Sequence, residues 1–410
     1  MPTTIAIEVG CYLCPTCPPR MRWFRLAPAG FLGTSRYTDS TRAAVTSLVV
    51  RHKLSFLGAA AVARELLHLS DLADTTVMRW FREDGDEVCY RTHLERMVAV
   101  FSGQFAIDEV YDGRAYVIRV TDPLNGLEIT SWLGEGSPTE ADVRELLLAL
   151  KAAGFVPLLV STDGSRLYPG ALAEVFPEAQ QQRCVFHFMQ GVNDALGKAF
   201  WEAYATMPAP KKRKRGRPKK LGRPREDKRK RANQDAVRAC RFLVFKRGGI
   251  DTDGKARFSP RETETLENGM RLCPALRELR RFVEAIHLLV GKTTTTHELA
   301  ASRRRAILAD ASFHALPGAS TVLRQLADDD LFARLTRHLD FENADPTSNH
   351  AERENREFRK RQGSHYRLRS VVSMCAFLDL MLVRRPKPDQ PRRLVRRVPV
   401  DAPVQEVLAS

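Results

Sequence analysis

The stretch QFAIDEVYDGRAYVIRVTDPLNGLEITSWL, residues 104–133, decides the fold class of this chain. Apolar, β-branched and aromatic residues are dense in three segments of it, 104–111, 114–122 and 127–133. Such segments are typical of β-strands, and the connections DG and PLNG between them are typical of tight turns. The stretch therefore predicts three consecutive strands of one sheet.

Helix and strand patterns alternate after these three strands. Residues 139–154 form a capped amphipathic pattern that ends at a glycine, which predicts a helix. A buried apolar strand is expected at 156–164, where it ends in the turn TDG, and a short helix is expected at 169–176. The segment QQRCVFHF, residues 181–188, predicts a last strand. Together these elements predict an α/β fold with a mixed sheet and flanking helices.

The rest of the chain falls into regions of different composition. Residues 190–345 lose the strand rhythm and predict an all-helical insertion, which contains a basic segment at 208–232. Helical patterns return in 346–385, so this range and residues 101–189 are interpreted as two parts of one α/β core. The Pro- and Arg-rich residues 386–410 predict a disordered basic tail.

Residues 51–100 are interpreted as a helical region with a helix-turn-helix-like hairpin at 54–83. The first helix is expected to bury Leu57, Ala61, Leu66 and Leu67, and the second, starting at the cap-like Asp74, to bury Val77, Trp80 and Phe81. Thr76 and Arg79 would then face outward, where such motifs contact base edges in the major groove of DNA. An ordinary helical hairpin gives the same pattern, so both interpretations stay open.

Residues 1–50 are irregular and contain three closely spaced cysteines, Cys11, Cys14 and Cys17. Cys-x-x-Cys pairs are typical of zinc modules, but a structural zinc site needs four ligands and a fourth is missing nearby. Zn²⁺ is therefore only a possible cofactor at this end of the chain.

The positive charge of the chain is concentrated in one place. The net charge is +16, and residues 211–231 hold fourteen Lys and Arg and two acids, so this run accounts for most of it. Such a run favours a polyanionic partner and salt-dependent binding. Within it, Arg215, Gly216, Arg217 and Pro218 resemble an AT-hook, which lies in the narrow minor groove of A·T-rich DNA. A basic linker or a targeting signal gives a similar composition.

The overall composition excludes several classes of protein. Hydrophobic residues make up 43% of the chain, but no run approaches the roughly 18 apolar residues that a membrane span needs. No basic leader followed by an apolar core begins the chain, and the eight cysteines are mostly scattered. We therefore expect no membrane partner, no secretory signal and a reducing compartment.

Two acidic residues occupy unusual positions in the predicted sheet. Asp108 lies inside the first apolar strand, where desolvating a lone carboxylate is costly, so it needs a partner or a function. Asp163 follows the strand at 156–162, at the sheet edge where open α/β folds bind ligands. The alternatives are a buried acid paired with an arginine for Asp108 and a turn residue for Asp163.

A third acid from a helix would complete a set of oxygen ligands for two Mg²⁺ or Mn²⁺ ions, the arrangement used in phosphoryl transfer. The stretch TSNHAERENREFRKR, residues 347–361, offers Glu352 for this role. Glu354 lies about 200° around the helix axis and is expected to face away. The basic residues that could contact phosphates are Arg356, Arg359, Lys360 and Arg361. Alone, this stretch is more typical of a solvated, salt-bridged helix.

Four short motifs in this order resemble the DDE transposases with an RNase H-like fold, in particular the bacterial insertion-sequence and Mutator-like groups. The motifs are Asp108 in the first strand, STDG with Asp163, a Cys-x-x-His pair and an Asn-x-x-Glu-x-x-Asn pattern. The pair is Cys184 and His187, and the last pattern is Asn349, Glu352 and Asn355. The resemblance covers roughly 104–190 and 345–382. Cys184 is equally well explained as a core residue.

The resemblance implies a transposase that binds the ends of its mobile element and cleaves and joins DNA strands. It implies Asp108, Asp163 and Glu352 as catalytic residues holding two Mg²⁺ ions, with Cys184, His187, Asn349 and Asn355 in supporting roles. It also implies a helical insertion between the second and third acids, a homo-oligomer on double-stranded element-end and target DNA, and a cytoplasmic location at the nucleoid. The alternatives are a catalytically inactive DNA-binding regulator derived from a transposase, and a nuclease of the same fold.

Overall fold

The computed structural model describes nine stretches of the chain: residues 11–13, 23–25, 37–88, 90–111, 115–210, 225–250, 254–363, 368–383 and 390–397. The chain divides into two compact units, and each is described by itself. The first unit comprises Met1–Ser102, Ile107–Val156 and His350–Arg392; the second comprises Gly103–Ala106, Pro157–Asn349 and Arg393–Ser410.

A five-stranded mixed sheet is present, as the sequence predicts. Its order is β5-β4-β3-β6-β7. The antiparallel pair β4–β5 belongs to the first unit, whereas β6 pairs in parallel with both β7 and the first three residues of β3 in the second unit. The strands are β3 (Gln104–Tyr111), β4 (Ala115–Asp122), β5 (Leu127–Glu135), β6 (Leu159–Thr162) and β7 (Gln180–Arg183).

The last strand is shorter than predicted, because QQRCVFHF does not continue as a strand. The strand β7 ends at Arg183, Cys184 is the N-cap, and helix α7 runs over Val185–Ala205. The residues that α7 buries, including Val185, Phe188, Met189 and Val192, recur at helical spacing. That period becomes visible only beyond residue 188, so the short apolar run has the local pattern of a strand.

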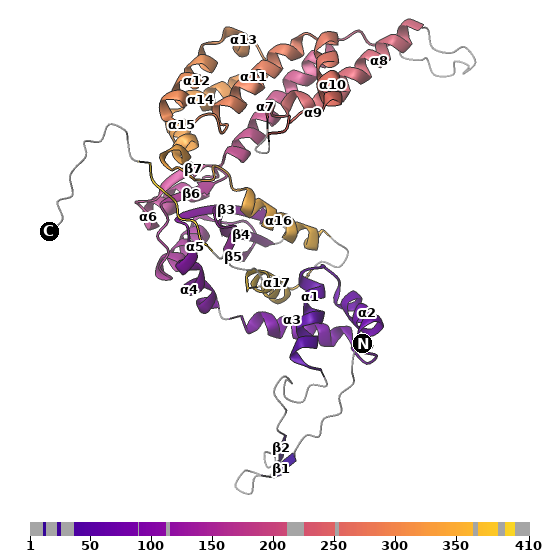
Figure 1. Cartoon of the computed structure of the whole chain (residues 1–410), viewed down its shortest axis with the longest axis vertical. Helices are drawn as coiled ribbons and strands as arrows, with labels where there is room; N and C mark the ends of the chain where they lie inside the picture. Colours follow the sequence, from indigo (N-terminus) through magenta and orange to yellow (C-terminus); the bar gives the residue numbers. More distant parts are fainter. Residues whose placement is uncertain are drawn as a thin grey trace, which may run out of the picture. The chain divides into compact units, whose positions relative to one another are not determined.

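An apolar core in the first unit is shared by several of its helices and by the sheet. It joins Trp80 and Phe81 to Val110 and Val117 of the sheet and to Phe377 of the C-terminal helix α17. Figure 1 shows α17 beside α1 and α3. The helices are α1 (Asp39–Val50), α2 (Phe56–Leu66), α3 (Asp74–Asp86), α4 (Tyr90–Val100), α5 (Glu140–Ala152), α16 (Asn349–Gln362) and α17 (Val371–Val383).

The helical hairpin formed by α2 and α3 is present, but the face that α2 buries was predicted wrongly. Leu57 and Leu66 are 59% and 69% exposed, whereas the small residues Ala59, Ala60 and Ala63 are buried. Small side chains let α2 pack closely against its neighbours, and the long leucines are left outside. In α3 the prediction is confirmed, since Val77, Trp80 and Phe81 are buried; Asp74 is the first helical residue and Ala73 takes the N-cap position.

The second unit contains most of the helices that the sequence predicts between residues 190 and 345. Figure 1 shows helices α7 to α15 gathered in one bundle. Its core includes Leu196, Phe200, Phe282 and Leu326. The further elements of the unit are α6 (Leu167–Val175), α8 (Arg225–Ala239), α9 (Arg241–Phe245), α10 (Pro260–Leu272), α11 (Ala275–Leu289), α12 (His297–Ala309), α13 (Ala311–His314), α14 (Ala319–Ala327), α15 (Asp329–Thr336) and the 3-10 helix η3 (Arg337–Asp340).

Three terminal or linking segments differ from the sequence interpretation. Residues 39–50, expected to be irregular, form α1. The end of the basic segment is helical, because α8 begins at Arg225. In the tail expected to be disordered, Arg396 forms a β-bridge with Phe341, and the adjacent Leu394 is buried against Phe341 and Leu159. Burial of this apolar residue explains why that part of the tail is ordered.

The short strands β1 (Cys11–Leu13) and β2 (Trp23–Arg25) form an antiparallel pair near the N-terminus. Cys14 and Cys17 lie outside the described residues, so zinc binding there stays a prediction. Within the described parts of the chain, no helix has both the length and the apolar character required to cross a membrane.

Candidate active site

A buried hydrogen bond joins two of the residues singled out in the sequence. Asp108, near the middle of β3, is 4% exposed, and its Oδ2 accepts a hydrogen bond of 2.7 Å from Asn355 Nδ2 on α16. Asn355 is itself fully buried. The carboxylate therefore has a defined amide donor that comes from a helix 247 residues away in sequence.

Glu352 lies one turn before Asn355 on the same helix and is half-buried. At a spacing of three residues, its side chain lies on the flank of α16 that also carries Asn355. Glu354 lies on another side of the helix, as expected, but that side is not solvent, since Glu354 is only 4% exposed. Helix α16 is thus buried on more than one side, which the arginine-rich sequence did not indicate.

Arg361 does not face outward, so its expected phosphate contact is wrong. It is 1% exposed, and its Nη1 donates to the carbonyl oxygens of Lys53 and Leu54 at 2.8 and 2.9 Å. Lys53 adopts a left-handed backbone with φ of 58°, and its Nζ lies 2.7 Å from Glu357 Oε2. Two contacts from α16 therefore hold a conformation that is costly for a non-glycine residue.

The other basic residues predicted on α16 are accessible. Arg356, Arg359 and Lys360 are all exposed, and Lys360 Nζ lies 2.9 Å from Glu357 Oε1. Asn349, the first residue of the helix, is also exposed. The three basic side chains form a surface on the part of the helix that follows Glu352.

Asp163 lies in the turn after β6, where it accepts a hydrogen bond of 2.7 Å from the backbone N–H of Ser165. It therefore fits the alternative interpretation as a turn residue. Arg183 packs on the same turn, since a Cβ on Gly164 would lie 2.6 Å from Arg183 Nη1. Burial lowers the pKa of Arg183, and the charge of Asp163 partly offsets this effect. The sequence interpretation missed this arginine, although it directly precedes Cys184.

Cys184 and His187 both contact Ser348, just before α16. Ser348 donates to Cys184 Sγ from its backbone N and from its Oγ, both at 3.2 Å, and its Oγ lies 3.5 Å from His187 Nδ1. Burial raises the pKa of the Cys184 thiol, but hydrogen bonds from His187 and Ser348 outweigh it, so the net pKa is below its ordinary value. The pair thus anchors the segment that leads into α16.

A second connection anchors the same segment and was missed in the sequence. Gln104 at the start of β3 donates to the carbonyl of Asp345 at 2.6 Å and accepts from its backbone N–H at 3.0 Å. The carbonyl of Pro346 accepts from the backbone N–H of Val185 at 3.0 Å. Ser348 could have been suspected as a polar residue directly before a helix, but Gln104 carries no local signal.

The donor atoms near Asp108 are suited to a hard divalent cation. Besides the carboxylate, Asn355 Oδ1 is buried and accepts no hydrogen bond from the described residues. Carboxylate and amide oxygens are ligands that Mg²⁺ and Mn²⁺ prefer. Among the described residues, however, no three His, Cys, Asp or Glu side chains are gathered closely enough to hold a metal ion.

The residues predicted to contact DNA outside α16 are only partly described. Arg79 on α3 is exposed and lies 3.8 Å from Glu83, one turn further along the helix, while Thr76 is half-buried. The AT-hook-like residues Arg215, Gly216, Arg217 and Pro218 lie outside the described residues.

Comparison with solved structures finds a distant likeness. The chain is similar to the Drosophila P element transposase strand transfer complex, with 11% sequence identity and a TM-score of 0.40, over 85% of this chain and 92% of that chain. No protein-family model and no curated protein matches the chain.

Proposed function

We propose that this chain is a transposase that binds the ends of a mobile element and cleaves and joins DNA strands by DDE chemistry. The observation that carries the proposal is the hydrogen bond from Asn355 to Asp108. It joins the strand that bears the first candidate acid to the helix that bears the third, at a residue of the Asn-x-x-Glu-x-x-Asn pattern. A solvated helix with no role at the sheet would not need this contact.

The pairing of β3 and β6 supports Asp163 as the second acid of the proposal. The two strands are parallel, with Ala106 opposite Ser161. Asp108 and Asp163 each come two residues after this pair in sequence.

In this proposal Asp108, Asp163 and Glu352 would hold two Mg²⁺ or Mn²⁺ ions, which when bound supply a Lewis acid for phosphodiester chemistry. Asn355 would orient the Asp108 carboxylate through its amide N–H. Arg183 would balance the charge of Asp163 in the absence of substrate. Cys184 and His187, through Ser348, would fix the start of the helix that carries Glu352.

DNA contacts would come from several surfaces of the chain. Arg356, Arg359 and Lys360 would contact phosphates next to the cleaved bond. Thr76 and Arg79 would contact the element end, and the AT-hook-like segment would lie in a minor groove. A homo-oligomer on paired ends, and a cytoplasmic location at the nucleoid, belong to the same proposal.

The experiment that tests the proposal is strand cleavage and joining on end DNA with Mg²⁺, for the wild type and for Asp108→Asn, Asp163→Asn and Glu352→Gln. We expect each variant to lose at least about 100-fold in rate, equivalent to roughly 3 kcal/mol of transition-state stabilisation. DNA binding measured in EDTA should be retained, because these substitutions remove no basic residue.

Glu354→Gln is the matched control, since it makes the same change two residues along the same helix. It should leave the rate within a few-fold of the wild type. If Glu354→Gln abolishes cleavage and Glu352→Gln does not, the third acid has been assigned wrongly. Cleavage without joining by the wild type would indicate a nuclease, and DNA binding without cleavage would indicate a regulator.

A further inference from the structure

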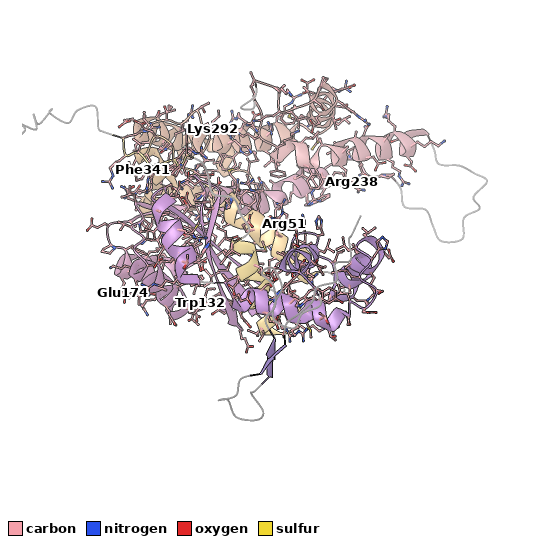
Figure 2. All side chains as sticks on the ribbon, turned by 60° about the horizontal axis from the view of Figure 1, so that its bottom comes forward. Arg51, Trp132, Glu174, Arg238, Lys292 and Phe341 are labelled. Atoms are coloured by element: carbon pink, nitrogen blue, oxygen red, sulfur yellow. The ribbon has the colours of Figure 1, made fainter. Side chains whose placement is uncertain are left out.

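An exposed surface of alternating arginine and aromatic side chains lies on the helical insertion of the second unit. It comprises Trp201 and Tyr204 of α7, Arg238 of α8, and Arg241 and Phe242 of α9. We call these five residues the arginine–aromatic surface. Figure 2 labels Arg238 on α8. None of the five is part of the proposed active site.

The side chains of this surface form a continuous series of ring contacts. Arg241 Cζ lies 4.8 Å from the ring centroid of Trp201 and 5.3 Å from that of Phe242. The rings of Trp201 and Tyr204 meet edge to face at 5.6 Å. Arg238 Cζ lies 5.5 Å from the Tyr204 ring, and its Nη2 donates to Tyr204 Oη at 3.0 Å. The guanidinium groups are thus held in place by the rings.

Two rings of this surface are exposed to solvent. Phe242 is 77% exposed and Trp201 is 40% exposed, whereas Phe200, Phe282 and Phe313 are buried in the core. An exposed phenylalanine contributes little to folding, because most of its apolar area stays in water. Side chains of this kind, clustered with cations, are typical of a binding surface.

The charge around the surface favours an anionic partner. Helix α8 carries six Lys and Arg residues and three acids, so it is net positive. Its first seven residues, 225–231, are also the end of the basic run. Aromatic ring faces combined with guanidinium groups are suited to bases that have left the double helix, since the rings stack on bases and the cations contact the backbone.

We propose that the arginine–aromatic surface binds an unpaired segment of DNA strand, with Trp201 and Phe242 stacking on bases and Arg241 and Arg238 contacting phosphates. The inference extends the proposed function by assigning single-stranded DNA as a ligand of the insertion. Duplex DNA keeps its base faces inside the stack, so it offers these rings nothing to stack on.

The test is binding of the full chain to a short single-stranded oligonucleotide, and to the same sequence as a duplex, in EDTA at several salt concentrations. Trp201→Leu and Phe242→Leu should each weaken single-strand binding by about tenfold. They should leave its salt dependence unchanged, because stacking releases no counterions. Arg241→Gln should instead make the negative slope of log affinity against log salt less steep, by about 0.7. Duplex binding should be unaffected by the two ring substitutions.

Ile250→Ala is the control for loss of exposed apolar area, since Ile250 is 69% exposed in the same unit. Trp201→Leu could weaken binding by loosening the packing of α7. Phe242→Leu avoids this problem, because the Phe242 ring is mostly exposed and contributes little to the core. Unchanged single-strand affinity in Phe242→Leu would overturn the proposal, and so would an equal loss of duplex affinity.

The outcome is separable from that of the proposed function. Binding in EDTA needs no strand cleavage, so a chain without transposase activity would still show single-strand selectivity if this surface has the role assigned to it. If the wild type cleaves and joins DNA but its ring variants bind single-stranded DNA as tightly as it does, only the role assigned to the arginine–aromatic surface is overturned.

Discussion

At the scale of single residues, the candidate acids lie in clearly different environments. Asp108 is buried and receives a hydrogen bond from Asn355, whereas Asp163 is half-buried in a turn beside Arg183. Glu352 and Glu354 are two residues apart, yet only Glu354 is fully buried. The residue type alone indicates none of these differences, because they depend on which neighbours the fold brings close.

His338 provides a prediction about pH. Burial lowers the pKa of His338 to about 4, with smaller contributions from His297 and Arg397. Because the pKa is lower in the folded state than in the unfolded chain, protonation of His338 favours unfolding. The free energy of unfolding is therefore highest above the ordinary pKa near 6.5 and decreases as the pH falls toward 4. We expect the loss to reach about 3 kcal/mol, measured by thermal unfolding between pH 7 and pH 4.

His338→Gln removes the titrating group and should make unfolding less sensitive to pH in this window. His314→Gln, at an exposed histidine, is the control and should leave the pH profile unchanged. An unaltered profile in His338→Gln would show that another group is responsible for the acid sensitivity.

At the scale of elements, close helix packing decides which residues are buried in the first unit. Helix α3 meets α17 at Gly85, where a Cβ would lie 2.5 Å from Ala376 Cβ and 2.6 Å from Ala376 Cα. Helix α16 is connected to the segment before α2 through Arg361 and Glu357. The hairpin that carries Thr76 and Arg79 is therefore packed in the same core as the helix that carries Glu352.

Gly85→Ala tests this close approach. The added methyl group would push backbone against backbone, so we expect a destabilisation of about 1–3 kcal/mol in chemical denaturation. Gly191→Ala is the matched control, because Gly191 lies in a helix and, apart from that helix's own backbone, no described atom lies within 4 Å of the added methyl. There alanine should stabilise the helix by about 0.5–1 kcal/mol. Similar effects of the two substitutions would contradict the packing of α3 on α17.

At the scale of the whole molecule, charge is distributed very unevenly along the chain. The run 211–231 carries fourteen of the 65 Lys and Arg residues, so DNA affinity should depend strongly on this segment. The binding of such a run is driven by counterion release and needs no fixed geometry.

Replacing the nine Lys and Arg residues of 211–224 with glutamine tests this dependence. The negative slope of log affinity for duplex DNA against log salt should become less steep by several units. Each phosphate that the chain no longer neutralises should contribute about 0.9 to this change. A scrambled segment of the same composition is the control. It should keep the slope but lose any preference for A·T-rich DNA if Arg215-Gly216-Arg217-Pro218 acts as an AT-hook. An unchanged slope after neutralisation would exclude this segment from DNA binding.

Local periodicity was sufficient to predict most of the elements. The three strands from residue 104, the capped helix α5, the apolar helix α17 and the helical character of residues 190–345 agree with the structure, because each contains enough residues to show its period. The strand expected at 181–188 is wrong because its window covers only the first turn of α7. The buried face of α2 was also misjudged, since the identity of its neighbours is not encoded locally.

The sequence by itself determined the α/β class, the helical insertion and the order of the acidic motifs, because these depend on composition and spacing along the chain. Only the tertiary structure decided that Asn355 bonds to Asp108, that Cys184 and His187 anchor Ser348, and that Arg361 points inward. Each of these contacts joins residues that are more than a hundred positions apart. Their side-chain directions are set by which elements pack together, and packing is a property of the folded chain and not of any local segment.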